Sequence, residues 1–179
     1  AVADIVLDMS RNMSKLVFGA AVGAVLTLAS TASLAGELGS FEAWSAQSFK
    51  VGGKLACSMW SQPQSAEGKY KQRGEIFVWV SHRPADKTRD RLSLEMGYPI
   101  KGQSIVTVRI DENSYTLPTH ESTAWSGDSK VDRAMVKAMR AGREMEVKGT
   151  SRRGTLTRDV YSLKGFTAAH KAITKACGL

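Results

Sequence analysis

The sequence predicts a mainly β domain, an antiparallel β-sandwich-like fold that carries two helices and one disulfide. Several short runs, such as residues 92–96, alternate apolar and polar side chains, and turn-forming residues separate these runs. Two segments, at about 129–141 and 166–177, instead repeat their apolar residues with the period of an α-helix. Many short strands with two helices and no internal repeat are typical of a sandwich-like or β-rich α+β domain.

The first expected strands form a hairpin around Gly52-Gly53, because paired glycines between two apolar runs favour a tight turn. Residues 37–47 are expected to lead into this hairpin, and the polar residues 61–73 to form a surface loop. Residues 75–80 are apolar on both faces, which predicts a strand covered on both sides. The strands are expected at 48–51, 54–60, 75–80, 92–96, 106–110, 115–117, 124–125, 144–149 and 154–162.

The first helix is expected over residues 129–141. Ser129, with Asp132 three residues later, resembles a capping box at its start. Gly142 is expected to cap its end. Its apolar face is predicted to fill the core with Val131, Met135 and Met139.

The second helix is expected to follow a turn at Gly165. Phe166, Ala169, Ile173 and Cys177 then lie on one face at 3.6 residues per turn. The helix therefore turns the thiol of Cys177 toward the sheet.

The chain has two cysteines, Cys57 and Cys177. In an exported chain such a pair indicates a disulfide, and the helical period agrees because it turns Cys177 toward the sheet that holds Cys57. The bond would close nearly the whole domain and contribute about 4–5 kcal/mol in the chain-entropy model. Two separate buried thiols are the alternative.

Residues 13–35 have the three parts of a secretory signal peptide. A basic start at Lys15 precedes the uncharged apolar run 16–28, and Ser33-Leu34-Ala35 offers small residues for cleavage after Ala35. The alternative is a membrane anchor, but a run of about 13 residues is shorter than the roughly 20 that span a bilayer. We expect an upstream extension at 1–12, a signal peptide at 13–35 and one exported β-rich domain at 36–179. The domain is expected to be periplasmic or secreted, with no transmembrane segment after signal removal.

The net charge of +8 belongs to residues 36–179, since the two acidic and two basic residues of 1–35 cancel. A basic surface favours anionic partners, among which we expect an envelope or host component, including a membrane surface, rather than nucleic acid. A role in solubility alone is the alternative. Weak candidates for contact with an anionic ligand lie in two expected loops, where mixed charges can also be merely solvated. They are Arg83, Lys87, Arg89, Arg152 and Arg153.

The sequence contains no common catalytic, metal or nucleotide motif. The three histidines, His82, His120 and His170, lie in no metal-binding spacing. Residues 149–154 lack the second glycine of a G-x-S-x-G elbow and are expected to form a hairpin turn. We therefore expect neither an enzyme nor a cofactor or metal. A hydrolase with noncontiguous catalytic residues is the alternative.

Three aromatic residues are candidates for a sugar-binding platform. They are Trp60, Tyr98 and Trp125. Because aromatic side chains beside strands often pack in the core or at its rim, packing is the alternative.

Several stretches, taken in this order, resemble the invasion-associated locus B family of exported bacterial proteins. They are 54–57 (Lys-Leu-Ala-Cys), Arg73-Gly74, 81–84, 96–99, Ala124-Trp125, 147–155 and 161–166. The resemblance covers nearly all of 36–179 and leaves out the extension 1–12. It implies a periplasmic or envelope-associated protein, related to members that are linked to invasion of host cells. It implies no catalytic residue.

These observations together predict an exported, noncatalytic protein of the periplasm or envelope, with an outer-membrane association among the expected locations. We expect it to bind an envelope or host component and to support host-cell interaction or invasion. The alternatives are a hydrolase, as above, and an assembly or structural factor of the envelope.

Overall fold

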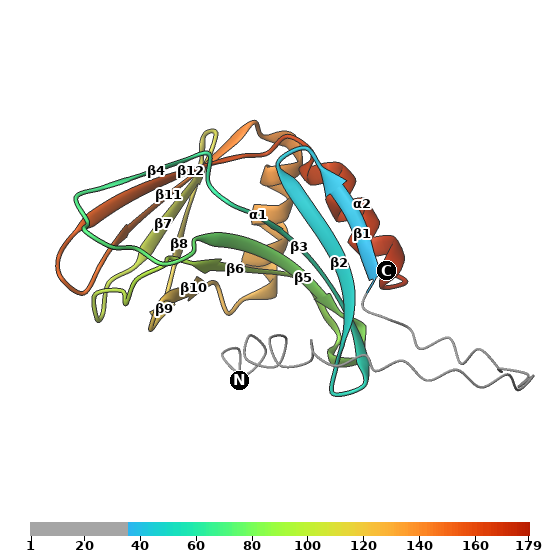
Figure 1. Cartoon of the computed structure of the whole chain (residues 1–179). Helices are drawn as coiled ribbons and strands as arrows, with labels where there is room; N and C mark the ends of the chain where they lie inside the picture. Colours follow the sequence, from blue (N-terminus) through green and yellow to red (C-terminus); the bar gives the residue numbers. More distant parts are fainter. Residues whose placement is uncertain (1–35) are drawn as a thin grey trace, which may run out of the picture. The chain divides into compact units, whose positions relative to one another are not determined.

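The computed structural model describes residues 36–179, so the predicted extension (1–12) and signal peptide (13–35) lie outside the described residues. These residues form two antiparallel sheets, of seven and five strands, with two α-helices and one disulfide (Figure 1). The predicted fold class is confirmed. Neither α-helix has the length and apolar content of a membrane span.

The seven-stranded sheet has the order β1-β2-β3-β5-β6-β10-β9. The predicted hairpin around Gly52-Gly53 joins β2 to β3, and both glycines have positive φ. A 3₁₀ turn at Pro84–Asp86 lies between β5 and β6. The strands are β1 (Gly36–Phe41), β2 (Trp44–Val51), β3 (Lys54–Ser61), β5 (Phe77–Arg83), β6 (Thr88–Glu95), β9 (Thr119–His120) and β10 (Thr123–Trp125).

The five-stranded sheet has the order β4-β12-β11-β7-β8. The predicted turn within 149–154 is confirmed as the hairpin between β11 and β12, which pair from Glu144 opposite Ser162 to Thr150 opposite Leu156. The strands are β4 (Ser65–Gly68), β7 (Val106–Ile110), β8 (Asn113–Leu117), β11 (Glu144–Thr150) and β12 (Leu156–Ser162).

Three details of the predicted strands are wrong. Residues 37–47 form β1 and the start of β2 instead of a lead-in, and residues 65–68 of the expected loop form β4. Strand β5 buries only one face, because Val78 and Val80 are fully buried whereas Phe77 and Trp79 on the other face are half-buried. The outward aromatic rings cover one another instead of packing under a second layer, with 5.5 Å between the ring centroids of Phe77 and Trp79.

Helix α1 (Ser129–Ala141) has the predicted span but a different cap. Asp128 is the N-cap, and its carboxylate accepts a hydrogen bond from the backbone N–H of Lys130 at 2.7 Å. Asp132 is instead buried, where it accepts hydrogen bonds from the Ser126 hydroxyl and the Leu92 backbone N–H. The predicted capping box is therefore absent, and the hydrogen bond from Leu92 to Asp132 instead connects β6 to α1.

Helix α2 (Phe166–Ala176) ends one residue before the predicted limit. It follows Gly165, whose φ of 85° lies in the left-handed region, and a Cβ there would collide with the backbone carbonyl of Phe41. Only glycine fits this turn, which lays α2 against β1, β2 and β3 (Figure 1).

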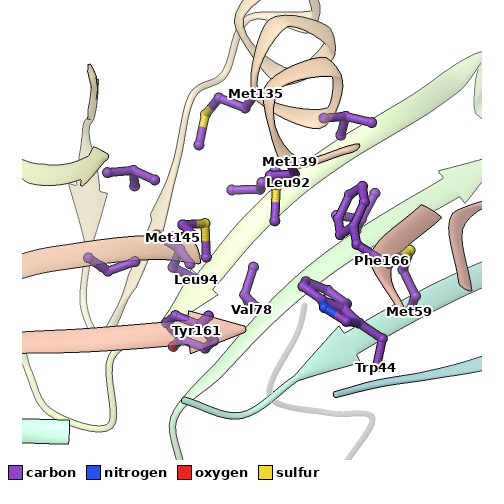
Figure 2. Packing of buried hydrophobic residues seen from close by; sticks show 14 of the residues in the cluster. Trp44, Met59, Val78, Leu92, Leu94, Met135, Met139, Met145, Tyr161 and Phe166 are labelled. Atoms are coloured by element: carbon purple, nitrogen blue, oxygen red, sulfur yellow. The ribbon is translucent and has the colours of Figure 1, made fainter. Parts of the chain in front are cut away.

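One hydrophobic core is shared by both sheets and both helices. Figure 2 shows Met135 and Met139 of α1 beside Leu92 of β6. Phe166 of α2 meets Trp44 of β2 edge-on, with 4.8 Å between ring centroids. The core therefore fastens each helix to the seven-stranded sheet.

Candidate functional site

The disulfide between Cys57 and Cys177 joins the middle of β3 to the residue after α2, as predicted. The two Cα atoms are 6.0 Å apart, and the bond spans 120 residues of sequence. Both residues are buried. Because the sulfur atoms are bonded to each other, neither is available as a nucleophile or a metal ligand.

Next to the disulfide, three buried ionisable residues form a hydrogen-bonded cluster, the His–Asp cluster of His82, Asp90 and His170. They come from β5, β6 and α2. The imidazole of His170 donates through Nε2 to the Asp90 carboxylate at 2.7 Å. The backbone N–H of Asp90 donates to Nδ1 of His82 at 3.1 Å, and Nε2 of His82 lies 3.2 Å from the hydroxyl of Thr174.

The hydrogen bonds fix the protonation of this cluster. Nδ1 of His82 accepts a hydrogen bond, so the proton of the neutral His82 ring is on Nε2. Nε2 donates this proton to the hydroxyl oxygen of Thr174 in a hydrogen bond. The Thr174 hydroxyl donates in turn to the backbone carbonyl of His170. Burial lowers the pKa of His82 to about 4, although the carboxylate of Asp90 opposes this shift. Burial would raise the pKa of Asp90, but the hydrogen bond from His170 and the nearby cations lower it on balance. His82 therefore cannot act as a general base that removes the hydroxyl proton of Thr174.

The His–Asp cluster is also the group of described residues whose donor atoms come close enough for a metal, within 4.8 Å of one another. Two imidazoles and a carboxylate would suit a first-row transition metal. However, a metal would have to displace the amide from Nδ1 of His82 and break the bond between His170 and Asp90. The arrangement fits a hydrogen-bonded core better than a metal centre, and the expected lack of a metal stays a prediction.

A second buried ionic contact was missed by the sequence analysis. The guanidinium of Arg73 donates two hydrogen bonds to the carboxylate of Asp159, at 2.7 and 2.6 Å, and both side chains are buried. Arg73 also donates to the carbonyl of Met96 and lies over the ring of Tyr98. This pair ties the segment between β4 and β5 to β12, so its role is structural.

The outer face of the five-stranded sheet has an open hollow with a volume of about 960 Å³. Strand register places Lys148 of β11 between Thr107 of β7 and Arg158 of β12, and Thr150 opposite Leu156. We call this hollow the basic outer face, because its lining has four cations and one carboxylate. These residues are Lys69, Lys148, Arg153, Arg158 and Glu67, beside the aliphatic residues Ile105 and Leu156.

The charges of the basic outer face are only partly paired. Glu146 accepts a hydrogen bond from Lys148 at 2.9 Å, and with Arg158 this holds the pKa of Glu146 at about 2. Arg158 also pairs with Glu67 at 2.9 Å. Within residues 36–179, neither Lys69 nor Arg153 forms an ion pair. These two exposed cations are available to an anion from solution.

The five predicted anion contacts do not come together. Arg83, Lys87 and Arg89 lie in the β5–β6 hairpin, whereas Arg152 and Arg153 lie in the β11–β12 hairpin. Figure 1 places these two hairpins at opposite ends of residues 36–179. Arg153 alone among the five lines the basic outer face, and their contact with a ligand stays a prediction.

The three predicted aromatic residues are also separated. Trp60 and Trp125 lie in one row on the outer face of the seven-stranded sheet, but Trp79 and Ser93 stand between them. The ring centroids of Trp60 and Trp79 are 5.3 Å apart. Tyr98 is turned away, with its hydroxyl 2.6 Å from that of Thr157. Trp79, which the sequence analysis assigned to a covered strand, completes the row.

Comparisons with known proteins agree with the fold. The family model described as Invasion associated locus B (IalB) protein matches residues 44–174, which include the His–Asp cluster and the lining of the basic outer face. Among solved structures, the crystal structure of invasion associated protein b from Bartonella henselae matches with a TM-score of 0.54 and 18% sequence identity. This match covers 77% of the present chain and 95% of that chain, and at such identity it shows the fold alone. No curated protein matches the chain.

Proposed function

The chain belongs to the invasion-associated locus B family, and from this premise we propose that it is an exported, noncatalytic envelope protein that binds an anionic envelope or host component. The proposed location is the periplasm, or outside the cell after secretion, with an association with the outer membrane. Support for host-cell interaction or invasion is part of the proposal, because the family is described as invasion-associated.

The observation that carries the proposal is the basic outer face. Its lining has four cations against one carboxylate, and Lys69 and Arg153 form no ion pair among residues 36–179. Unpaired cations around an open hollow raise the local concentration of anions and can hydrogen-bond phosphate or carboxylate oxygens. A phosphate- or carboxylate-bearing ligand therefore fits this surface.

The buried clusters support a binding role over catalysis. The contact between His82 and Thr174 would be the start of a hydrolase site, but the proton on Nε2 of His82 points at Thr174 and prevents base catalysis. Cys57 and Cys177 are bonded to each other. Export is supported by the predicted leader and by this disulfide, which is stable in an oxidising compartment.

The test is a calorimetric titration of the exported protein with inositol hexakisphosphate, a soluble polyphosphate. Lys69→Gln/Arg153→Gln removes the two cations of the basic outer face that form no ion pair among residues 36–179. We expect it to weaken binding roughly tenfold, because each exposed cation contributes up to about 1 kcal/mol. Its free energy of unfolding should change by less than about 0.5 kcal/mol per site, as is usual for surface substitutions.

The matched comparison is Arg83→Gln/Lys87→Gln, which removes two exposed cations from the opposite hairpin. We expect this variant to bind within about twofold of the wild-type protein, since such changes alter exposed charges only locally. No measurable binding by the wild-type protein would overturn the proposal. A loss caused by the hairpin variant, and not by the outer-face variant, would show that the basic outer face is the wrong surface.

A further inference from the structure

The two most exposed of the large hydrophobic side chains in residues 36–179 lie in the same hollow. Leu156 is 75% exposed and Ile105 is 56% exposed, and both line the basic outer face. An exposed apolar patch rimmed by polar residues is typical of a surface that contacts a membrane or a protein, whereas single exposed aliphatic side chains are common.

The fold brings these two side chains to one end of the five-stranded sheet. Leu156 begins β12 opposite Thr150, and Ile105 immediately precedes β7. A bridge between Ile100 and Ser151 and a hydrogen bond from the Lys101 N–H to the Thr150 carbonyl hold the loop before β7 against the β11–β12 hairpin. The two apolar side chains are thereby fixed on adjoining segments.

Exposed cations line the same hollow as this apolar pair. Lys69 follows β4, Lys148 belongs to β11 and Arg153 belongs to the β11–β12 hairpin. The arrangement of aliphatic side chains with cations around them is the chemistry of a protein surface that lies on an anionic membrane. The cations meet lipid phosphates while the aliphatic groups enter the boundary with the acyl chains.

A protein partner fits the same surface less well. A stable protein interface buries about 1,200–2,000 Å² and has an apolar centre. Two aliphatic side chains among cations are a small apolar contribution to such an interface, whereas the charge excess of the lining complements a surface of anionic lipid headgroups.

Building on the proposed function, we infer that this end of the five-stranded sheet docks on an anionic lipid bilayer. Lys69, Lys148 and Arg153 contact the phosphates of the headgroups. Ile105 and Leu156 enter the interface between headgroups and acyl chains. The bilayer is thus the anionic envelope or host component that the basic outer face recognises.

The opposite end of residues 36–179 offers a natural comparison. Leu55 of β3 is 40% exposed and lies near Arg83, but Asp86 in the same place pairs with Lys54 at 3.6 Å. A single aliphatic residue with partly neutralised cations lacks the combination that we assign to membrane docking. Leu55→Ser is therefore the control for loss of an exposed aliphatic side chain.

The experiment measures co-sedimentation of the exported protein with two kinds of vesicle. All variants have the same N-terminus. One kind contains phosphatidylcholine alone, and the other contains phosphatidylcholine and phosphatidylglycerol in equal parts. We expect binding to the anionic vesicles only. Ile105→Ser/Leu156→Ser should lower the partition coefficient about tenfold, because two aliphatic groups no longer leave water. Its affinity for inositol hexakisphosphate should stay within about twofold, since no cation is changed. Leu55→Ser should behave as the wild-type protein.

The outcomes separate this inference from the proposed function. Binding of inositol hexakisphosphate without binding of anionic vesicles would overturn the membrane inference and leave the proposed function standing. Absence of both would overturn both. Vesicle binding that Ile105→Ser/Leu156→Ser leaves unchanged, or that Leu55→Ser abolishes, would also overturn the assignment. Circular dichroism of each variant establishes that it is folded, and Leu156→Ser alone should give part of the loss.

Discussion

The cluster under α2 and the basic outer face of the five-stranded sheet place ionisable groups in opposite surroundings. Under α2, His82 and Asp90 are buried, and each has hydrogen-bond partners within the protein. On the outer face, Lys69 and Arg153 are exposed and form no ion pair among residues 36–179. Buried polar groups need hydrogen-bond partners within the protein, whereas exposed charges are solvated by water and remain available to a ligand.

The two regions also differ in how they are fastened. The disulfide, the His–Asp cluster and the contact between Phe166 and Trp44 all hold α2 on the seven-stranded sheet. The basic outer face instead presents side chains from paired strands and from the turns and loops next to them. Changes under α2 should therefore act on stability, and changes on the outer face should act on binding.

The largest expected effect is loss of the disulfide. Cys57→Ala/Cys177→Ala should lower the free energy of unfolding by about 4–5 kcal/mol, since the bond no longer restricts a loop of more than 100 residues in the unfolded chain. Urea unfolding of the exported protein measures this change. Reduction of the wild-type protein should give the same loss, and reductant should do nothing to the variant. A loss below about 1 kcal/mol would contradict the view that this region holds the fold together.

Acidification should reduce stability in two different pH ranges, one set by His82 under α2 and the other by Glu146 of the five-stranded sheet. In the unfolded chain, His82 takes up a proton near its ordinary pKa of 6.5. In the folded protein its pKa is about 4, so it takes up this proton only at lower pH. The unfolded state therefore binds more protons in this window, and stability falls as the pH decreases from about 6.5 to 4. The total loss is about 3 kcal/mol, at 1.4 kcal/mol for each pKa unit. The pKa of Glu146 is lowered from its ordinary value of 4.5 to about 2, so its contribution to stability is present above pH 4.5 and is lost as the pH falls from there toward 2.

Urea unfolding at a series of pH values checks this prediction, with His82→Gln as the comparison. The variant should lose the pH dependence between about 6.5 and 4 while the dependence below about 4.5 persists. An unchanged slope in the upper window would show that other groups titrate there. Such a result would contradict the assignment of this pH dependence to His82.

Much of the fold could be predicted because its main elements carry a clear apolar period. The span of α1 and the buried face of α2 follow from residues that repeat at helical spacing. Strands β1 and β4 were missed because each lies at the edge of its sheet and buries little apolar area. Edge strands have one neighbour and need few apolar side chains, so alternation is a weak signal there.

The candidate sites were harder to predict because their residues meet only through tertiary structure. Arg73 and Asp159 are 86 residues apart, and Arg73 lies in a segment that reads as polar loop. The basic outer face combines β4, β7, β11 and β12. A local signal did exist, since Lys148 alternates with buried Val147 and Gly149, and exposed Leu156 alternates with buried Thr157. The pairing of these strands, which local patterns do not reveal, decides that the two exposed positions share one face.

Hydrogen–deuterium exchange of the exported protein, with and without anionic vesicles, tests whether the basic outer face docks on a membrane. Vesicles should slow exchange at residues 101–107 and 148–158, where the basic outer face would contact lipid. Exchange at residues 82–90 and 166–177 should stay the same, because the β5–β6 hairpin and α2 take no part in docking. Slower exchange confined to residues 82–90, or no change at 148–158 when the protein is bound to vesicles, would contradict it.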